Sequence, residues 1–597
     1  MAAFETCITN LLDSGRDPFN DPSPSMVVRQ IPLKSDAANT PESKKAVEEE
    51  LAEHRKRGTW KEDSVTELSD LLKDTSKQEI MMGRIFGILG NKHDELEAEH
   101  HKKKYRSVFQ GSNIRTKTGT SAIELFEEVS SSPASFIAIR CALACAVLKK
   151  FVATVRDALC AYLQADIYKP GRIETWVSLP KDYWPDSWFT DGAKRQQPKY
   201  WNPYVLLVKA LYGHPESGAL WEQLLSIALC KEGWHAIPDW PGVWIHNDKS
   251  ILVVYVDDLL LCCLPKDVKN HWAILDDAIE FKDPPEPIDK FIGAKYILDG
   301  FNEKNPLAPR SCTTDMCSYT KSMARKFTET TGAVLNKSVA TPYISPDEWA
   351  TSDETPGRFT STCSSHAATS LFAARVGRPD LCVATQRLCS AVSRWNGVHD
   401  LALTRLMAYA AAHCDIKLRG TLSPEDLDDL EILAYCDADW NGDPETTKST
   451  TGFYLELVGR KSGNSWAFSW GSVLQSTTGS ATAETETVSA SHTMRREAIP
   501  AQMLFEHMLD VRLPVRMMID NTQCLSAIAK GYSKKLRHIG RTQRVCLGLL
   551  NEIVNNAEWK ISCEHHPTAT HKGDMFIKML APAKFREALK MIDMGAQ

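Results

Sequence analysis

Two apolar runs of six residues each, Ile251–Val256 and Leu259–Leu264, flank a pair of adjacent carboxylates, Asp257 and Asp258. Runs of this length that are rich in Val, Ile and Leu predict two buried strands joined by a tight turn. Two neighbouring anions are costly to desolvate unless a cation or hydrogen bonds compensate them. The hairpin is therefore expected to hold a divalent metal ion at its tip, the alternative being an ordinary Asp-containing turn between core strands.

The segment Tyr255-Val-Asp-Asp258 inside an apolar hairpin resembles the metal-binding palm motif of reverse transcriptases. Upstream, Asp157 ends a strand-like apolar run, and Ala161 and Tyr162 follow at the distance seen in the first palm motif of the same family. The resemblance implies that Asp157, Asp257 and Asp258 are metal ligands, and that Tyr162 packs under the sugar and excludes a 2′-hydroxyl. From the residues alone, a helix N-cap explains Asp157 equally well.

A basic run, Lys102–Gly111, places Lys104 and Arg106 two residues apart, so they project from the same face of a strand. Two cations on one face suit a triphosphate or a nucleic-acid backbone, although such a pair is often only a solvated face. Together with Gly58-Thr-Trp60 and Glu124-Leu-Phe-Glu127, this order resembles the fingers of copia-type reverse transcriptases. The resemblance implies that Lys104 and Arg106 contact the phosphates of the incoming nucleotide.

Further segments are similar to the same family. Lys209–Trp221 contains the Ala-Leu-Tyr-Gly sequence of another palm motif, but Glu216 stands where the family usually has Gln. An extra carboxylate is therefore expected to face the triphosphate or, alternatively, to point outward. Tyr319–Phe327 resembles the thumb helix, and Gly377-Arg-Pro-Asp-Leu381 matches the connecting region.

A second group of carboxylates begins near residue 431. Three strands, a helix, a strand, helices, a strand and a terminal helix are predicted in that order, which is the order of the ribonuclease H fold. Motif similarity implies that its two metals are bound by four carboxylates: Asp437, Glu486, Asp520 and Asp574. Taken singly, each would more often be a cap or a surface charge. Asp439 and Glu484 are near neighbours and rank second as ligands.

The segment Ser533–Arg544 is the most basic in this half of the chain. It is expected to lie along the phosphates of an RNA–DNA hybrid, where each neutralised phosphate adds salt-dependent affinity. The alternative is a solvated helix end. Gly540 and Arg541-Thr-Gln-Arg544 depart from the family pattern, so substrate positioning is less well specified here than the carboxylates.

Length and similarity together define the expected architecture, because 597 residues are too many for one hydrophobic core. The fold class is α/β and α+β multidomain, a right-hand polymerase followed by a ribonuclease H-like domain. The expected units are a disordered leader (1–45), fingers (46–135), palm (136–300), thumb and connection (301–428), and the ribonuclease H-like domain (429–597). The leader is inferred from Pro, Ser, Asp and Asn without periodicity.

Composition limits the binding sites and the cellular compartment that the chain can have. The net charge of −6 means that nucleic acid must bind through local basic patches. The 17 Cys residues lack repeated CxxC spacing, which favours a reducing compartment and gives no paired zinc-ligand set. No apolar run approaches the ~20 residues of a membrane helix.

The chain is thus identified as similar to the reverse transcriptase and ribonuclease H end of a copia-type retrotransposon Pol polyprotein. The resemblance implies two Mg²⁺ (or Mn²⁺) ions per active site, with RNA template, DNA primer, RNA–DNA hybrid and dNTPs as partners, alongside other retrotransposon proteins and no membrane. It implies a cytoplasmic retrotransposon particle, with the nucleus as an alternative. No protease or integrase pattern precedes the polymerase, so we expect either a product processed from a longer precursor or a decayed genomic copy. The rival hypothesis is a catalytically inactive protein that still binds nucleic acid.

Overall fold

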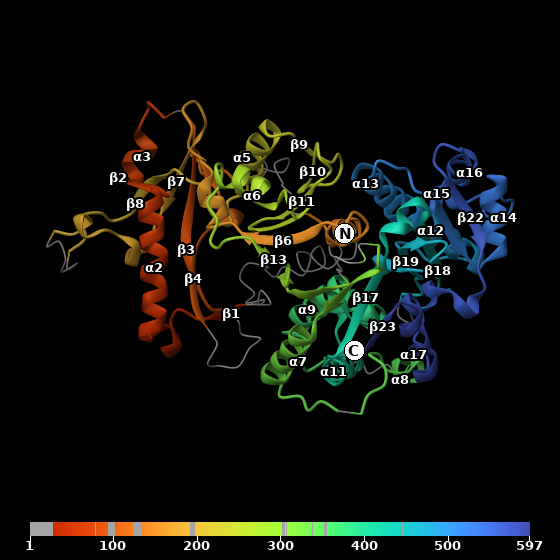
Figure 1. The fold of residues 1–597 in the computed structure, drawn as a ribbon. Coiled ribbons are helices and arrows are strands. Elements are labelled where there is room, and N and C mark those ends of the chain that lie inside the picture. The colour runs from red at the N-terminus through yellow and green to blue at the C-terminus, as the bar shows by residue number, and fades with distance from the viewer. Residues whose placement is uncertain are drawn as a thin grey trace.

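The computed structural model describes residues 28–77, 79–92, 102–122, 134–190, 197–300, 305, 307–336, 338–350, 355–443 and 446–596. These residues form a mixed α/β multidomain structure built on four β-sheets. Figure 1 shows the first sheet at one end of the molecule, the second and third sheets in the middle, and the fourth at the other end. None of the described helices is both long and apolar enough to cross a membrane.

The first sheet has the order β1-β3-β7-β8-β2, and β4 and β5 also pair with β3. Helix α2 lies against β4, where Glu50 accepts a hydrogen bond from the backbone N–H of Ser107 (3.0 Å). The elements are β1 (Val28–Ile31), α2 (Pro41–Arg57), β2 (Trp60–Glu67), α3 (Leu68–Lys73), β3 (Ile80–Lys92), β4 (Lys102–Phe109), β5 (Arg115–Thr116), β7 (Glu174–Ser178) and β8 (Pro203–Leu207).

The predicted leader, residues 1–45, extends too far along the chain. Strand β1 pairs antiparallel with β3, and α2 begins at Pro41. The side chain of Thr40 accepts a hydrogen bond from the N–H of Ser43, and Pro41 occupies the first helical position, so a local cap starts the helix despite the polar composition. Residues 1–27 and Glu124–Glu127 lie outside the described residues.

The second sheet carries the predicted Asp-Asp hairpin and has the order β13-β6-β12-β11-β10-β9. The predicted hairpin is confirmed: β11 and β12 pair antiparallel, and nearly all of their residues are buried. The elements are α4 (Phe136–Leu148), β6 (Val152–Asp157), α5 (Ser217–Lys231), β9 (Trp234–Ala236), β10 (Val243–His246), β11 (Ile251–Tyr255), β12 (Asp258–Cys263), α6 (Val268–Asp276) and β13 (Glu286–Pro287).

The third sheet has the order β14-β15-β16-β17-β23 and is packed with helices. Its elements are β14 (Lys290–Phe291), β15 (Ala294–Asp299), β16 (Arg310–Asp315), α7 (Cys317–Thr331), α8 (Pro346–Ala350), α9 (Cys363–Val376), α10 (Cys382–Ser390), α11 (Gly397–Ala412), β17 (Ile416–Leu422), α17 (Pro582–Met591) and β23 (Met594–Ala596). Because β23 pairs with β17, the end of the chain returns across the predicted boundary at residues 428 and 429.

The fourth sheet has the order β20-β19-β18-β21-β22, with β18, β21 and β22 mutually parallel and β18, β19 and β20 antiparallel. This is the element order predicted from residue 431 onward. The elements are β18 (Leu430–Ala438), β19 (Thr450–Gly459), β20 (Ser465–Leu474), α12 (Thr482–His492), a π-helix (Thr493–Ala498), α13 (Ile499–Leu509), β21 (Val515–Ile519), α14 (Thr522–Lys530), α15 (Ile539–Thr542), α16 (Leu547–Asn555) and β22 (Ile561–His565).

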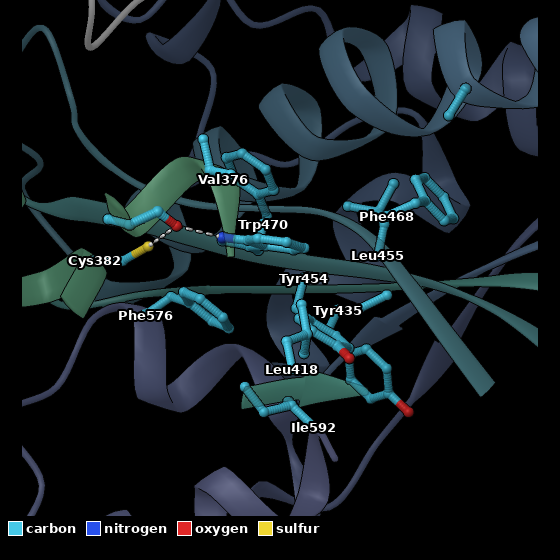
Figure 2. Packing of buried hydrophobic residues seen from close by; sticks show 14 of the residues in the cluster. Val376, Cys382, Leu418, Tyr435, Tyr454, Leu455, Phe468, Trp470, Phe576 and Ile592 are labelled. Carbon is cyan, nitrogen blue, oxygen red and sulfur yellow. Dashed lines mark hydrogen bonds between the residues drawn. The ribbon is translucent and has the colours of Figure 1, made fainter. Parts of the chain in front are cut away.

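One continuous hydrophobic core joins the second, third and fourth sheets. Figure 2 shows part of it, where Trp470 of β20 lies beside Val376, and Phe468 of the same strand lies beside Leu455 of β19. The indole N–H of Trp470 donates to the carbonyl of Ala374 (2.8 Å). The domains are therefore fused through shared apolar packing rather than linked by a flexible connection.

The buried ion pair of Arg378 and Asp380 provides a test of this core. Arg378 donates to both carboxylate oxygens of Asp380 (2.9 and 2.7 Å), and both side chains are fully buried. We predict that Asp380→Ala lowers the free energy of unfolding by about 3–5 kcal/mol, because it leaves an unpaired buried guanidinium.

Chemical denaturation measures this change in stability, and the double variant R378M/D380L should recover most of it. Glu49→Ala, which breaks an exposed pair with Lys45 (3.8 Å), is the matched control and should change stability little. Equal stability of Asp380→Ala and the wild type would contradict the prediction.

Candidate active sites and nucleic-acid interface

The first carboxylate cluster lies where β6 ends and the β11–β12 hairpin turns. Asp157 and Asp258 are direct cross-strand partners, and Asp257 lies in the two-residue turn that precedes Asp258. Val256 in this turn has φ 57°, a conformation that strains a β-branched residue. The indole N–H of Trp221 donates to the carbonyl of Val256 (3.0 Å) and helps to hold the turn.

The environment of Asp257 is suited to a cation. Burial raises the pKa of Asp257, and the charge of Asp157 raises it further. The hydroxyl of Tyr212 donates to Asp257 Oδ2 (2.8 Å), whereas Oδ1 is buried without a hydrogen-bond partner among the described residues. An unpartnered buried carboxylate oxygen beside further carboxylates is a donor set that fits Mg²⁺.

Cations from two other elements approach this cluster. The guanidinium of Arg106, on β4 of the first sheet, lies 4.6 Å from the ring centre of Tyr212. The charges of Arg106 and Lys104 both act to lower the pKa of Asp257, against the effect of burial. Lys282 Nζ lies 3.8 Å from Asp157 Oδ2. The structure thus brings the predicted phosphate-binding pair to the predicted metal ligands.

Tyr162 also lies beside the cluster. Its ring centre is 4.7 Å from that of Tyr212, and burial together with the charge of Asp257 raises the pKa of Tyr162. All six residues that sequence motifs assigned to this site are therefore placed around one turn. Their metal and nucleotide roles remain predictions, and among the described residues the three carboxylates are not one of the groups whose ligand atoms all lie within 4.8 Å.

The second cluster is more compact and more deeply buried. Ligand oxygens of Asp437, Glu486 and Asp520 lie within 4.8 Å of one another, as do ligand atoms of Asp437, His571 and Asp574. Asp437 is at the end of β18, Glu486 is in α12, Asp520 follows β21, and Asp574 is in a 3₁₀ turn (Lys572–Phe576). The structure therefore gathers all four predicted carboxylates, with Asp437 common to both groups.

Charge repulsion in this cluster is strong. Asp437 is 2% exposed and Glu486 is 4% exposed. Burial and the proximity of Asp574 and Glu486 raise the pKa of Asp437, and burial with the charge of Asp520 raises the pKa of Glu486 to about 8. Glu486 Oε2 is buried without a hydrogen-bond partner among the described residues. This all-oxygen donor set also fits Mg²⁺.

Lys578 partly compensates the second cluster. Its Nζ lies 2.7 Å from Asp574 Oδ1 and 3.3 Å from Asp437 Oδ2. Burial opposes its charge, but Asp437 and Asp574 outweigh burial and raise the pKa of Lys578 to about 12. One ammonium group among four carboxylates leaves the cluster net negative, so room for further positive charge remains.

Two glycines allow the 3₁₀ turn to approach the sheet. Gly452, opposite Asp437 on β19, faces Phe576 and Ile577, and a Cβ at this position would lie 2.6 Å from Ile577 Cγ2. A Cβ at Gly573 would lie 2.7 Å from the His571 ring and 3.2 Å from the Cβ of Asp437. Larger residues at either position would push Asp574 away from Asp437.

The two residues ranked second as ligands have structural partners. Asp439 accepts a hydrogen bond from the backbone N–H of Thr450. Glu484 accepts from Ser480 and from Gln543 (3.2 Å), and His538 Nε2 lies 3.3 Å away. Neither belongs to the 4.8 Å groups of the described residues. Glu216, the departure in the Ala-Leu-Tyr-Gly segment, is paired with Arg172 (2.5 Å), which neutralises the extra carboxylate.

A groove of about 1190 Å³ lies between α9, α10 and the fourth sheet, and none of the four carboxylates of the second cluster lines it. We name it the basic groove. No Asp or Glu is among the described residues that line it, and apart from Arg394, which pairs with Asp443 (3.7 Å), its cations have no described carboxylate within 4.0 Å. The lining cations are Arg375, Arg394, Lys448, Arg495, Arg496, Arg541 and Arg544. Such unneutralised charge is typical of a phosphate-binding surface.

Sequence reasoning missed three residues of these sites, Lys282, His571 and Lys578, and gave no individual role to Tyr212 of the Ala-Leu-Tyr-Gly motif. The spacing of Lys578, four residues after Asp574, was a usable signal, because such a pair meets on one face of a helical turn. His571 is held by the carbonyl of Met518 (2.9 Å), a contact between distant segments that the sequence does not reveal.

A sequence comparison with known proteins agrees with the motifs. The chain is 26% identical over 370 residues to a retrovirus-related Pol polyprotein from a transposon of Arabidopsis thaliana, a match that covers 60% of this chain and 22% of the relative. The chain thus spans about a fifth of the length of that relative. No protein-family model matches the sequence. A structure of a foamy viral protease–reverse transcriptase in complex with double-stranded DNA aligns with a TM-score of 0.42 and 12% identity, covering 89% of this chain and 70% of that one. The predicted similarity to retrotransposon Pol polyproteins is confirmed.

The raised pKa of Glu486 predicts how stability depends on pH. Between the ordinary pKa of 4.5 and the folded value of about 8, the folded state holds a proton that the unfolded state releases. The free energy of unfolding should therefore fall as pH rises through this window. Glu486→Gln removes the titration, so in EDTA it should raise the melting temperature at pH 8 more than at pH 5.

Thermal unfolding monitored by circular dichroism measures this effect. Glu484→Gln is the control on the same helix, because hydrogen bonds lower the pKa of Glu484 against the effect of burial, and its removal should not stabilise the protein. Mg²⁺ should raise the melting temperature at pH 8 more in the wild type than in Glu486→Gln, because the variant keeps the first cluster but loses one ligand of the second. Parallel pH profiles for wild type and Glu486→Gln would count against a strained carboxylate cluster.

Proposed function

On the basis of this relationship to retrotransposon Pol polyproteins, we propose that the chain is an RNA-directed DNA polymerase with an associated ribonuclease H. It copies retrotransposon RNA into DNA and cleaves the RNA of the resulting hybrid. The observation that carries the proposal is the presence of two separate carboxylate clusters, each on its own sheet and each with a buried carboxylate oxygen that lacks a partner among the described residues. We place the reaction in the cytoplasmic particle of such an element.

The polymerase site is proposed at the first cluster. Asp157, Asp257 and Asp258 would hold two Mg²⁺ ions, with Tyr212 orienting Asp257 through its hydroxyl. Arg106 and Lys104 would bind the triphosphate of the incoming nucleotide, because their charges already act on Asp257.

Nucleotide selection in this site would depend on Tyr162. Its ring packs against Tyr212, which itself contacts Asp257, so it lies where a sugar adjoining the phosphates would rest. A ring under the sugar would exclude a 2′-hydroxyl by contact. In this assignment the first sheet forms the fingers and the second sheet the palm. The third sheet with its helices forms the thumb and connection, to which β23 also belongs.

The ribonuclease H site is proposed at the second cluster. Asp437, Glu486, Asp520 and Asp574 would hold a second pair of Mg²⁺ ions, and Lys578 would orient Asp437 and Asp574. In both sites bound ions would supply charge neutralisation at the reacting phosphate and would lower the pKa of the attacking hydroxyl or water.

The basic groove is proposed to hold nucleic acid beyond this second site. Helix α12 borders both, because Val488 lines the groove and Glu486 belongs to the cluster on another face of the helix. A nucleic acid strand that leaves the cleavage site would pass around α12 and place its phosphates against the unneutralised arginines of the groove. RNA–DNA hybrid, RNA template and DNA primer are the partners that this arrangement suits.

The two sites should be separable by mutation. Asp257→Asn should abolish primer extension on an RNA template while preserving cleavage of RNA in a preformed hybrid, and Asp437→Asn should do the reverse. Both substitutions remove a metal ligand, and each cluster lies on a different sheet without shared carboxylates. Both activities are measured with Mg²⁺ on both variants.

Asp239→Asn and Asp428→Asn serve as matched controls, because they neutralise exposed carboxylates outside the two clusters and should retain both activities. Absence of both activities in either cluster variant, with an unchanged circular dichroism spectrum, would contradict two independent sites. Hybrid binding by the wild type without either activity would support the inactive nucleic-acid-binding alternative.

Salt dependence tests the basic groove. A variant that changes Arg495, Arg496, Arg541 and Arg544 to Gln should bind an RNA–DNA hybrid more weakly. Its plot of log affinity against log salt should be shallower by roughly 0.9 for each phosphate that the variant no longer neutralises. Binding is measured in the Asp437→Asn background, so that cleavage cannot interfere.

The control changes four cations far from the groove to Gln: Lys44, Lys45, Lys56 and Lys326. It removes the same net charge, so an equal reduction in slope would show a general charge effect and contradict the groove. A reduced slope in the groove variant alone is the expected result.

A further inference from the structure

A third group of metal-binding side chains lies in the second sheet, away from both carboxylate clusters. His246 ends β10, Asp248 lies in the β10–β11 turn, and His271 is in α6. His246 Nδ1 is 2.8 Å from Asp248 Oδ1, and His271 Nε2 is 2.9 Å from Asp248 Oδ2. Ligand atoms of all three lie within 4.8 Å of one another. The proposed polymerase and ribonuclease functions use none of them.

The hydrogen bonds of His246 define its tautomer. Its Nε2 lies 3.0 Å from the carbonyl oxygen of Glu232, which can only accept, so Nε2 carries the proton. The backbone N–H of Asp248 donates to His246 Nδ1 (3.2 Å), so Nδ1 presents a lone pair. That lone pair and the Asp248 carboxylate oxygen are then two electron-rich atoms 2.8 Å apart. A cation between them would convert this repulsion into two bonds.

His271 and Asp248 are held in place to bind a metal ion. Asp248 Oδ1 accepts a hydrogen bond from the backbone N–H of Ser250 (2.8 Å), which orients the carboxylate. His271 Nε2 faces Asp248 Oδ2, and His271 Nδ1 is buried without a hydrogen-bond partner among the described residues. A metal ion on Nε2 would replace the hydrogen bond between this nitrogen and the carboxylate.

The surroundings hold the rings in place while leaving one side open. The indole of Trp234 is 5.1 Å from both imidazole rings, between ring centres. His271 is 3% exposed, whereas the side chain of Asp248 is 37% exposed. The bond from His246 Nε2 to a backbone carbonyl is the usual outer contact of a histidine that ligates a metal.

We propose that His246, Asp248 and His271 form a binding site for one transition-metal ion from the end of the first row. Zn²⁺ is the ion that we expect there. His246 Nδ1, the Asp248 carboxylate and His271 Nε2 supply three ligands, and water takes the fourth position from the open side. Two imidazole ligands favour Zn²⁺ over Mg²⁺, which prefers oxygen. Donor atoms on one tetrahedral zinc lie roughly 3.3 Å apart, so each histidine nitrogen needs to move about 0.5 Å away from its Asp248 oxygen.

The ion would hold two elements of the second-sheet region together. Asp248 lies just before β11, and α6 follows β12, so the site ties together the two ends of the hairpin that carries Asp257 and Asp258. Five residues of β11 separate the site from those carboxylates, or about 17 Å. The ion would therefore stabilise the hairpin without touching the reacting groups.

Metal binding by the full-length protein tests this proposal. Zn²⁺ binding is measured by equilibrium dialysis and Co²⁺ binding by visible absorption, both in excess Mg²⁺ so that the carboxylate clusters are occupied. We expect one tight ion per chain, a Co²⁺ spectrum without a thiolate charge-transfer band, and a higher melting temperature with Zn²⁺.

His246→Asn is the main variant, because this residue is partly exposed and its replacement should leave the metal-free fold intact, as checked by circular dichroism. It should weaken Zn²⁺ binding at least about tenfold and abolish the zinc-dependent rise in melting temperature, and Asp248→Asn should do the same. His235→Asn, an exposed histidine on β9 that contacts Asn247 (3.0 Å), is the matched control and should bind Zn²⁺ normally.

Three results would overturn the proposal: no tight Zn²⁺ in the wild type, unchanged Zn²⁺ affinity in His246→Asn, or a thiolate band in the Co²⁺ spectrum. The first would show that the group is only a hydrogen-bonded network. Primer extension by Asp257→Asn and by His246→Asn is measured in parallel. A failure of the polymerase assignment then appears in the first variant, independently of zinc binding.

Discussion

Burial of grouped carboxylates is the constraint on which both proposed sites depend. Ionised groups within a few ångströms of one another in a low-dielectric interior need compensating positive charge or retained protons. In the second cluster the compensation is incomplete: Lys578 neutralises part of the charge, and the pKa of Glu486 still rises to about 8. In the first cluster, the hydroxyl of Tyr212 and the guanidinium of Arg106 partly compensate the charge of Asp257. Two unrelated sheets thus present the same unmet demand for cations.

Helix α4 makes these two sites parts of one body. Arg140 of this buried helix donates to the carbonyls of Phe468 (2.7 Å) and Arg375 (2.9 Å), and its guanidinium lies 4.0 Å from the centre of a Trp470 ring. The same helix packs on β11 and β12, which carry the first cluster. The distance between the two carboxylate clusters is therefore set by a shared hydrophobic core.

Sequence patterns predicted the parts of the structure that depend on local order. The Asp257 hairpin, the element order of the fourth sheet and all four carboxylates of the second cluster follow from apolar runs and motifs, because strand ends and helix starts fix where such residues lie. Contacts between residues far apart in the sequence could not be predicted. Such contacts pair β23 with β17 and neutralise Glu216 through Arg172. They also explain why residues 28–45 form ordered structure. The same holds for His246, Asp248 and His271, whose spacing matches no familiar zinc pattern and which only the folded sheet brings together.

The central claim is that two separate carboxylate clusters bind divalent metal ions, and anomalous scattering from crystals soaked in Mn²⁺ tests it most directly. We expect Mn²⁺ peaks beside Asp257 on the second sheet and beside Asp437 on the fourth sheet, within bonding distance of the carboxylate oxygens. The peaks beside Asp437 should vanish in Asp437→Asn crystals while those beside Asp257 remain. The account would be contradicted by crystals soaked to saturation that show no Mn²⁺ at either cluster. In such crystals Lys578 would still bond to Asp437 and Asp574, and Tyr212 would still bond to Asp257.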